Sequence, residues 1–369
     1  MGPRTSTSIA LGALAACLAL AGPAPAATHS VAAGQSIQAA LDAAQPGDTV
    51  RVAAGTFHEN VSITKDDITL RGAGSGAGGT VLMPAATPTP SACLEPGSTE
   101  IHGVCVIGQI DFATEQPGRP IHDVTVRDLA IEGFSGWGVA AFNVGHLIVR
   151  HVEARGNAGY GISGFILSEV RFLDNVVMEN GEPGFYVGDS PHADAVVAGN
   201  VALHNGVGSG EGFGILLRDA TDGVVHHNQV DGNCVGIVVV ETGAPDPTGD
   251  WTIQHNDVTA NNGVCPPNTE EGEMGPPLSG LGIFVWGAHD TEVQHNHVAG
   301  HHPGAATPFS GGIVVGSSTE LMGADPVDND VRRNDLEDNQ TDLLWDGTGT
   351  DNEFSHNNCE TSQPPGLCG

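Results

Sequence analysis

The sequence carries very little positive charge. Only 12 of its 369 residues are Lys or Arg, with Lys65 the single lysine, against 44 Asp and Glu, which gives a formal net charge of −32. Nucleic-acid binding is therefore not expected, because contacts to phosphates need basic groups. A polyanionic substrate would also be repelled unless a cation mediated the contact.

Long apolar runs are missing, apart from one near the N-terminus. Residues 9–20 are apolar and precede the small residues Ala24–Ala27, a pattern typical of a secretory signal peptide that ends near residue 27. Leu14–Cys17 also resembles a bacterial lipobox, so full secretion and a lipid anchor on Cys17 both remain open. No other segment is apolar enough to span a bilayer.

Helical periodicity is also rare. Between residues 169 and 262, short β-branched runs separated by Gly, Asn and Asp repeat every 24 to 28 residues, and a glycine-led apolar strand closes each repeat; from residue 250 the repeats lengthen to about 40 residues. Self-similarity at this period indicates a solenoid, and the short alternating runs indicate strands. One asparagine recurs at the same point of each repeat, at Asn175, Asn200, Asn228, Asn256 and Asn296.

A second asparagine follows the first by five residues, at Asn180, Asn205, Asn233 and Asn261. We expect the repeated asparagines to point inward as a ladder, each amide bonding its equivalent one coil away at the ~4.8 Å strand spacing. This pattern resembles the right-handed parallel β-helix of the pectin-lyase-like superfamily. The resemblance implies an all-β solenoid and says little about function.

One domain over residues 28–369 is enough for this solenoid. Residues 35–44 predict a short helix, with Ser36 as its N-cap, that covers the open end of the first coil. Residues 73–120 are rich in Gly and Pro and predict early coils with loop excursions. Regular coils are expected over residues 121–360.

Six cysteines follow the signal segment, and an even number in an exported chain predicts disulfides. The sequence alone allows fifteen pairings. The simplest has each cysteine bonded to its neighbour, so that each bond closes a local loop: Cys93–Cys105, Cys234–Cys265 and Cys359–Cys368, the last locking the C-terminal tail.

Three carboxylates lie five residues past the glycine that leads three successive strands, at Asp189, Asp219 and Glu241. Stacked about 5 Å apart, they would not all ionise without a counter-charge, which Ca²⁺ can supply. Pectate-lyase-like enzymes use calcium in this way, and the resemblance implies that Arg218, beside the column, binds a uronate or removes its proton. Alternatively, acidic residues occupy these turns only because turns are solvated.

The segment Tyr186–His192 is similar to the Y-G-F-D-P-H signature of mannuronan C5-epimerases. Tyr186 and Asp189 keep the spacing of that signature, whereas Ser190 is an extra residue before His192. The resemblance implies that Tyr186, Asp189 and His192 surround the C5 proton of a uronate. A turn sequence without a catalytic role is the alternative.

Three histidines precede the ladder asparagines on successive coils, at His227, His255 and His295. They predict an outward column, which either binds a metal or is only a repeated surface residue. Four aromatic residues at outward strand positions predict an exposed surface that suits sugar rings. They are Phe142, Phe165, Phe284 and Trp286.

The sequence thus favours a secreted, monomeric polysaccharide-active enzyme, a lyase or C5-epimerase that removes the C5 proton of a uronate. Tyr186, His192 and Arg218 are the expected catalytic residues, and Asp189, Asp219 and Glu241 the expected calcium ligands. Two alternatives remain open: a non-catalytic carbohydrate-binding or cell-surface protein, and a periplasmic metal-handling protein that uses the histidine column.

Overall fold

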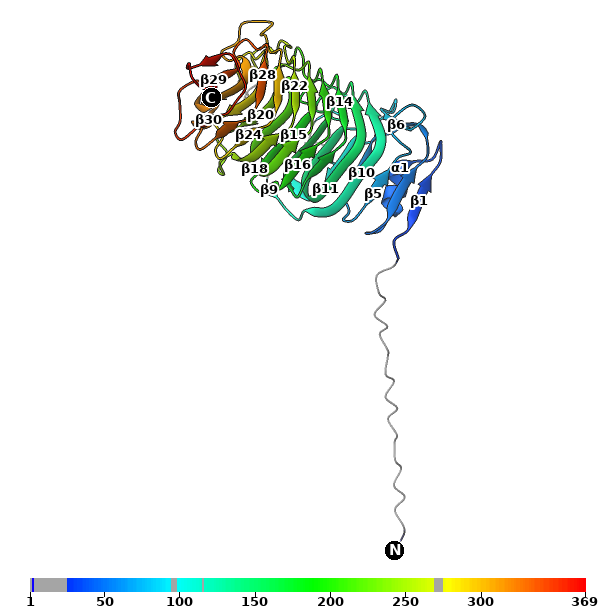
Figure 1. Cartoon of the computed structure of the whole chain (residues 1–369). Coiled ribbons are helices and arrows are strands. Elements are labelled where there is room, and N and C mark those ends of the chain that lie inside the picture. Colours follow the sequence, from blue (N-terminus) through cyan, green and yellow to red (C-terminus); the bar gives the residue numbers. More distant parts are fainter. Residues whose placement is uncertain (1, 3–24, 94–97, 115, 269–274) are drawn as a thin grey trace.

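The computed structural model describes residue 2 and residues 25–93, 98–114, 116–268 and 275–369. Strands stack along one elongated solenoid, whose N-terminal end carries the one α-helix of the described residues and whose C-terminal end carries the last coils (Figure 1). Each complete coil contributes parallel strands to three flat faces, which we call the first, second and third faces. The predicted all-β solenoid is confirmed.

The first face is formed by strands that follow the glycine of each repeat. Its strands are β4 (Val61–Ile63), β7 (Val104–Ile107), the start of β11 (Val139–Arg155), β12 (Ile162–Ser168), β15 (Phe185–Ser190), the start of β18 (Phe213–His226), β20 (Val235–Val240), β23 (Leu281–Trp286), β26 (Gly311–Gly316), β29 (Leu343–Trp345) and β31 (Ser362–Gln363).

The second face contains the strands that end just before the first ladder asparagine. Its strands are β1 (Thr28–Val31), β2 (Thr49–Val52), β5 (Thr69–Arg71), the start of β10 (Ile121–Glu132), the middle of β11, β13 (Arg171–Leu173), β16 (Ala195–Ala198), the end of β18, β21 (Gly249–Gln254), β24 (Glu292–Gln294), β27 (Asp330–Arg332) and β30 (Glu353–Ser355).

The third face lies between the two ladder asparagines of each coil. Its strands are β3 (Gly55–His58), β6 (Thr80–Met83), the ends of β10 and β11, β14 (Val176–Met178), β17 (Val201–Leu203), β19 (Gln229–Asp231), β22 (Asp257–Thr259), β25 (His297–Ala299) and β28 (Asp335–Glu337). Outside these faces, β8 (Ile110–Asp111) and β9 (Gln116–Pro117) form an antiparallel hairpin in the loop-rich early region.

The predicted asparagine ladder is confirmed. In the first ladder each side-chain amide donates to the carbonyl oxygen of the next, as from Asn200 to Asn228 at 3.0 Å and from Asn228 to Asn256 at 2.9 Å. The second asparagines form a ladder of their own, as from Asn180 to Asn205 at 2.9 Å. These amides also bond the backbone, so the polar corners of the solenoid are buried with their hydrogen bonds made.

The predicted helix is shorter than expected. Helix α1 spans Ile37–Ala43, and Ser36 caps it by accepting a hydrogen bond from the backbone of Ala39. Ile37 and Leu41 are buried in the core of the first coils. At the other end of the helix, Lys65 donates to three backbone carbonyl oxygens, which places its charge at the negative end of the helix dipole.

All three predicted disulfides are present, at Cys93–Cys105, Cys234–Cys265 and Cys359–Cys368. They are compatible with an extracellular location, because disulfides persist in oxidising compartments. The predicted signal peptide, including Cys17, lies almost entirely outside the described residues. Within the described part of the chain, no helix has the length and apolar character needed to cross a membrane.

Candidate functional site

The outer surface of the first face is unusually apolar in the middle of the solenoid. Along β15, Phe185 and Val187 point into the core, whereas Tyr186 points outward. The strand register pairs Tyr186 with Leu216 on β18, and Leu216 with Val238 on β20. These outward residues are buried as well, so the segments that leave the strands must cover them.

Gly188 creates the space that Tyr186 occupies. A Cβ atom at Gly188 would lie 2.0 Å from the Tyr186 hydroxyl, so the tyrosine side chain lies directly across this glycine. Gly188 pairs with Phe165 on β12 and with Arg218 on β18. The tyrosine ring is therefore held between an aromatic side chain, with ring centroids 4.6 Å apart, and the guanidinium of Arg218.

Tyr186 has 0% exposure, and its hydroxyl makes no hydrogen bond within the described residues. Burial raises the pKa of this phenol far above its ordinary value, with only partial compensation from Arg218. Tyr186 is therefore neutral at physiological pH.

Arg218 lies over the Tyr186 ring, with its central carbon 5.6 Å from the ring centroid. Tyr186, Tyr160 and Glu211 raise the pKa of this guanidinium, although burial opposes them, so Arg218 stays charged. Its Nε atom is buried and has no hydrogen-bond partner in the described part of the chain. A charged group with an unused donor is unusual in a folded protein and is a mark of a functional position.

A cavity of about 370 Å³ opens above Arg218. Phe213, Leu216 and Val240 form its apolar wall, and residues 275–278 and 320–322 form its rim. Glu211 lines the same cavity and accepts a hydrogen bond from the Tyr160 hydroxyl at 3.3 Å. The site thus combines a fixed cation, a carboxylate and apolar walls, which is typical of a small-ligand site.

Both tyrosines of the chain belong to this assembly. The Tyr160 ring packs against Tyr186 with centroids 5.1 Å apart, and burial raises the pKa of the Tyr160 phenol well above its ordinary value. Tyr160 therefore donates to Glu211 as a neutral phenol and fixes the orientation of that carboxylate.

Comparison with known proteins decides the fold. A family model described as the right handed beta helix region matches residues 102–258. The chain is a right-handed parallel β-helix. No curated protein sequence matches it.

Solved structures share this β-helix at low identity. The A-module of the Azotobacter vinelandii mannuronan C-5 epimerase AlgE4 is 21% identical, with a TM-score of 0.59 over 89% of this chain and 91% of that one. A DFA-IIIase from Arthrobacter chlorophenolicus A6 is 12% identical, with a TM-score of 0.53 over 85% and 84%. The Dettilon tailspike protein is 14% identical, with a TM-score of 0.54 over 91% of this chain and 60% of that one. At these identities the likeness establishes the β-helix fold alone.

The predicted catalytic residues are only partly brought together. Tyr186 and Arg218 are in contact, whereas His192 lies in the turn after β15 with its side chain 87% exposed. The imidazole of His192 faces Asp222, with 3.3 Å between Nδ1 and Oδ2. His192 therefore does not share the buried environment of Tyr186.

The predicted carboxylate column is in register, because Asp189, Asp219 and Glu241 occupy equivalent positions on neighbouring coils of the β-helix. The alternative that acidic residues occupy these turns only because the turns are solvated does not hold for two of them, since Asp219 is 7% and Glu241 4% exposed. Asp219 accepts hydrogen bonds from Thr242, and Glu241 accepts them from the backbones of Gly243 and Thr248. These two carboxylates organise the turn after β20.

That arrangement does not fit the predicted calcium site. Calcium needs six to eight oxygen atoms around one point, and the oxygens of Asp219 and Glu241 are turned toward separate backbone donors. Among the described residues, no three His, Cys, Asp or Glu side chains gather as a group that could hold a metal ion. We derive no step through calcium.

The predicted histidine column is present, with the rings of His227, His255 and His295 stacked 5.2 Å apart. Each residue has a positive φ near 54°, a conformation that this turn imposes on every coil. Successive planes are only 4° and 15° apart, so the ring nitrogens cannot converge on one ion at about 2 Å. The same register places His151 in this column as well.

The prediction of exposed aromatic residues is wrong. Phe142, Phe284 and Trp286 point outward from the strands but are buried, and Phe165 is only partly exposed. They pack on each other and on Trp137 or Phe309 instead. Sequence analysis also missed Glu211 and Tyr160, which lie in segments between strands; the scarcity of tyrosine in the chain was the one available signal.

Proposed function

We propose that this β-helix binds an acidic polysaccharide in the cavity over Arg218 and removes the C5 proton of a uronate, as a lyase or a C5-epimerase. The observation that carries the proposal is the charged guanidinium of Arg218 on an apolar cavity wall, with its buried Nε unpaired within the described residues. A carboxylate is the natural partner for such a planar, forked donor.

Arg218 binds the uronate carboxylate and holds it with a fixed positive charge. When the C5 proton leaves, negative charge spreads onto that carboxylate, and the guanidinium stabilises the developing charge more strongly than it stabilises the ground state. Because the pKa of Arg218 is raised, it acts as this electrostatic group rather than as the base.

Glu211 is the carboxylate that accepts the C5 proton, because it lines the same cavity and Tyr160 orients it. In a lyase the C4–O4 bond then breaks with its electrons on O4, a double bond forms between C4 and C5, and O4 takes up the proton that Glu211 holds. In an epimerase a proton from water returns to C5 from the opposite face, and Glu211 releases its proton to solvent. Tyr186 is a positioning residue, since its ring holds the guanidinium and its hydroxyl is not exposed.

Exchange of the C5 proton tests the step that both reactions share. The secreted protein is incubated with polymannuronate, polyguluronate and polygalacturonate in D₂O, and deuterium at C5 is followed by NMR, with ultraviolet absorbance to detect unsaturated ends. We expect Arg218→Gln to lower the exchange rate about 10²–10³-fold and Glu211→Gln to lower it about 10²–10⁴-fold.

Arg333→Gln is the matched control, because Arg333 is exposed on a distant coil and carries the same charge. It should retain full exchange. His192→Gln distinguishes proton transfer by Glu211 in the cavity from proton transfer by His192. A loss of exchange as large as that of Arg218→Gln would assign the proton transfer to the His192–Asp222 pair and overturn our assignment of Glu211.

Non-catalytic carbohydrate binding is the second candidate function. The full burial of Tyr186 favours it, because the phenol that the epimerase signature places beside C5 is not exposed. Binding of an oligouronate that depends on Arg218, without any C5 exchange across the panel, would establish this alternative.

A further inference from the structure

Four of the eleven arginines stand in one column on the second face, far from the cavity over Arg218. The chain has 12 basic residues of which one is lysine, so the remaining 11 are arginines. The register pairs Arg51 with Arg71, Arg71 with Arg127, and Arg127 with Arg150, on β2, β5, β10 and β11. We call these four residues the arginine column.

Such a column is unexpected in a chain with a net charge of −32. Adjacent strands are about 4.8 Å apart, so the four guanidinium groups repel one another along a line of about 14 Å. Scattered arginines would avoid this repulsion. Their alignment therefore needs anions beside them.

Among the described residues, Asp128 is the one anion that this column shares. Asp128 accepts hydrogen bonds from Arg71 at 3.1 Å and from Arg127 at 2.9 Å, and its other oxygen faces His151. Although partial burial alone would raise it, the bonds from Arg127 and His151 lower the pKa of Asp128, which stays ionised. Arg51 makes no hydrogen bond or ion pair with a described residue.

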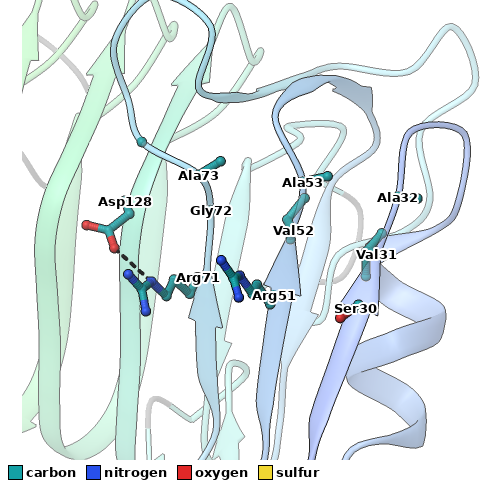
Figure 2. Close-up of a pocket in the computed structure, with 11 residues that line it drawn as sticks. Ser30, Val31, Ala32, Arg51, Val52, Ala53, Arg71, Gly72, Ala73 and Asp128 are labelled. Carbon is teal, nitrogen blue, oxygen red and sulfur yellow. Dashed lines mark hydrogen bonds and ion pairs between the residues drawn. The ribbon is translucent and has the colours of Figure 1, made fainter.

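A cavity of about 620 Å³ lies beside the free end of the column. Its lining includes Arg51, Arg71 and Asp128, and the two guanidinium groups lie side by side on neighbouring strands (Figure 2). The cavity is therefore lined both by Arg51, which has no partner among the described residues, and by the Arg71–Asp128 pair.

A row of hydroxyl groups runs parallel to the arginines on the same surface. Thr49, Thr69 and Thr125 lie two residues before Arg51, Arg71 and Arg127 and pair with one another in the same register. Residues two apart on a strand point to the same side, so threonines and arginines share one flat outer surface. This surface offers hydroxyls and forked cations in parallel lines, without aromatic residues for stacking bases.

We propose that the arginine column is an accessory binding site for an anionic glycan, which lies along the solenoid axis with its carboxylate or sulfate groups on successive arginines. The threonine row meets the sugar hydroxyls. A chain is favoured over a single inorganic anion because the column extends over four strands. Nucleic acid is disfavoured, since the described part of this surface lacks aromatic groups on which bases could stack. This site is separate from the cavity over Arg218.

Binding of hexasaccharides by isothermal titration calorimetry tests the proposal in the Arg218→Gln variant, which removes the first-face site. The probes are a hexauronate, a sulfated glycosaminoglycan hexasaccharide, neutral cellohexaose, inorganic sulfate and a single-stranded DNA oligonucleotide. We expect at least one anionic hexasaccharide to bind and cellohexaose not to bind. Arg51→Gln should weaken the anionic binding about tenfold, as expected for a lost charge-assisted hydrogen bond, and Arg51→Gln/Arg150→Gln should weaken it further.

Arg333→Gln is the control, because Arg333 lies in the turn after the second-face strand β27, in a late coil of the solenoid. The variant removes the same charge and should leave the affinity within about twofold. Equal weakening by Arg51→Gln and Arg333→Gln would show only long-range electrostatics and would overturn the site. Sulfate or DNA binding as tightly as the hexasaccharides would overturn the glycan assignment. Because the background already lacks Arg218, failure of the first-face site does not change these outcomes.

Discussion

Buried polar groups are hydrogen-bonded in the interior of the solenoid, whereas two on the outer surface of its first face lack a partner among the described residues. Inside, the ladder asparagines in the middle of the solenoid are buried and bonded on both sides, as Asn228 is to Asn200 and Asn256. Outside, Tyr186 and Arg218 each keep a buried polar atom without a partner in the described chain. The interior is thus optimised for stability, whereas the first face retains unused binding capacity, as functional sites commonly do.

The largest effect on stability is expected from a substitution in the interior asparagine ladder. Asn228→Leu removes the acceptor of the Asn200 amide and backbone and the donor to Val197, and each buried group left unpaired costs roughly 1–3 kcal/mol. We expect a loss of several kcal/mol in the free energy of unfolding, measured by chemical denaturation. Asn358→Leu, at an exposed asparagine, is the control and should be nearly neutral. Equal stability of the two variants would refute the importance of the ladder.

The second ladder contains one irregular member that makes the interior sensitive to acid. His301 replaces the expected asparagine, accepts from the Asn261 amide at Nε2 and so donates from Nδ1 to Asn339 at 2.8 Å. Burial lowers the pKa of His301 to about 4, against an ordinary 6.5. Protonation at Nε2 would turn this atom into a donor that faces the donor amide of Asn261.

His301 should therefore reduce stability at low pH. The unfolded chain takes up the proton near pH 6.5 and the folded chain only near pH 4, so the stability present above pH 6.5 is lost as the pH falls toward 4. His301→Asn should remove an effect on the order of 3 kcal/mol. Denaturation between pH 4 and 8 measures it; part of the acid sensitivity will remain, because burial also lowers the pKa of His102 to about 4.

His356→Asn is the control for this prediction, because His356 is exposed and its positive φ suits asparagine. It should leave the pH profile unchanged. A wild-type profile retained in full by His301→Asn would show that the buried imidazole does not set the acid sensitivity.

A smaller effect, of opposite sign, is expected on the first face. Arg218→Met removes a buried donor that has no partner among the described residues and keeps an unbranched side chain over Tyr186. The relieved cost exceeds the lost cation–π contact, so we expect the free energy of unfolding to rise by about 1 kcal/mol. Calorimetric melting measures the change, and oligouronate binding should be lost at the same time. A destabilised variant would show that Arg218 has a structural role.

The contrast between the two regions also explains what the sequence could predict. Repeats fix register, so the strands and the ladder through Asn228 could be predicted from spacing. The disulfides could not, because the sequence allows fifteen pairings and neighbouring cysteines were only the simplest of them. Glu211 and Tyr160 lie between strands, where no repeat fixes their position. The direction of the Asp219 and Glu241 carboxylates depends on donors at Thr242 and Thr248, in a turn whose length varies between coils.

The motif around Tyr186 is an intermediate case. Strand alternation accounts for the outward direction of Tyr186, and Gly188 gives the ring its space. The motif also implies that His192 is nearby, yet the extra Ser190 is buried in β15 and bonds the Gly188 carbonyl, so the chain reaches the turn before His192. In this motif, the type of residue at Tyr186 was a better guide to the structure than the spacing between Tyr186 and His192.

The smallest expected effect on stability is the difference between removing the hydroxyl of Tyr160 and removing that of Tyr186. The Tyr160 hydroxyl donates to Glu211, so Tyr160→Phe should cost about 1 kcal/mol, the ordinary value of one hydrogen bond. The Tyr186 hydroxyl has no partner within the described residues, so Tyr186→Phe should be neutral or slightly stabilising. Thermal melting of the two variants should therefore show shifts of different sign. C5 exchange should fall in Tyr160→Phe, because Glu211 loses its orienting donor, and should persist in Tyr186→Phe, because the ring under Arg218 remains. Loss of exchange in Tyr186→Phe without loss of stability would instead make its hydroxyl a proton-transfer group, one that the substrate reaches when the residues covering it move aside.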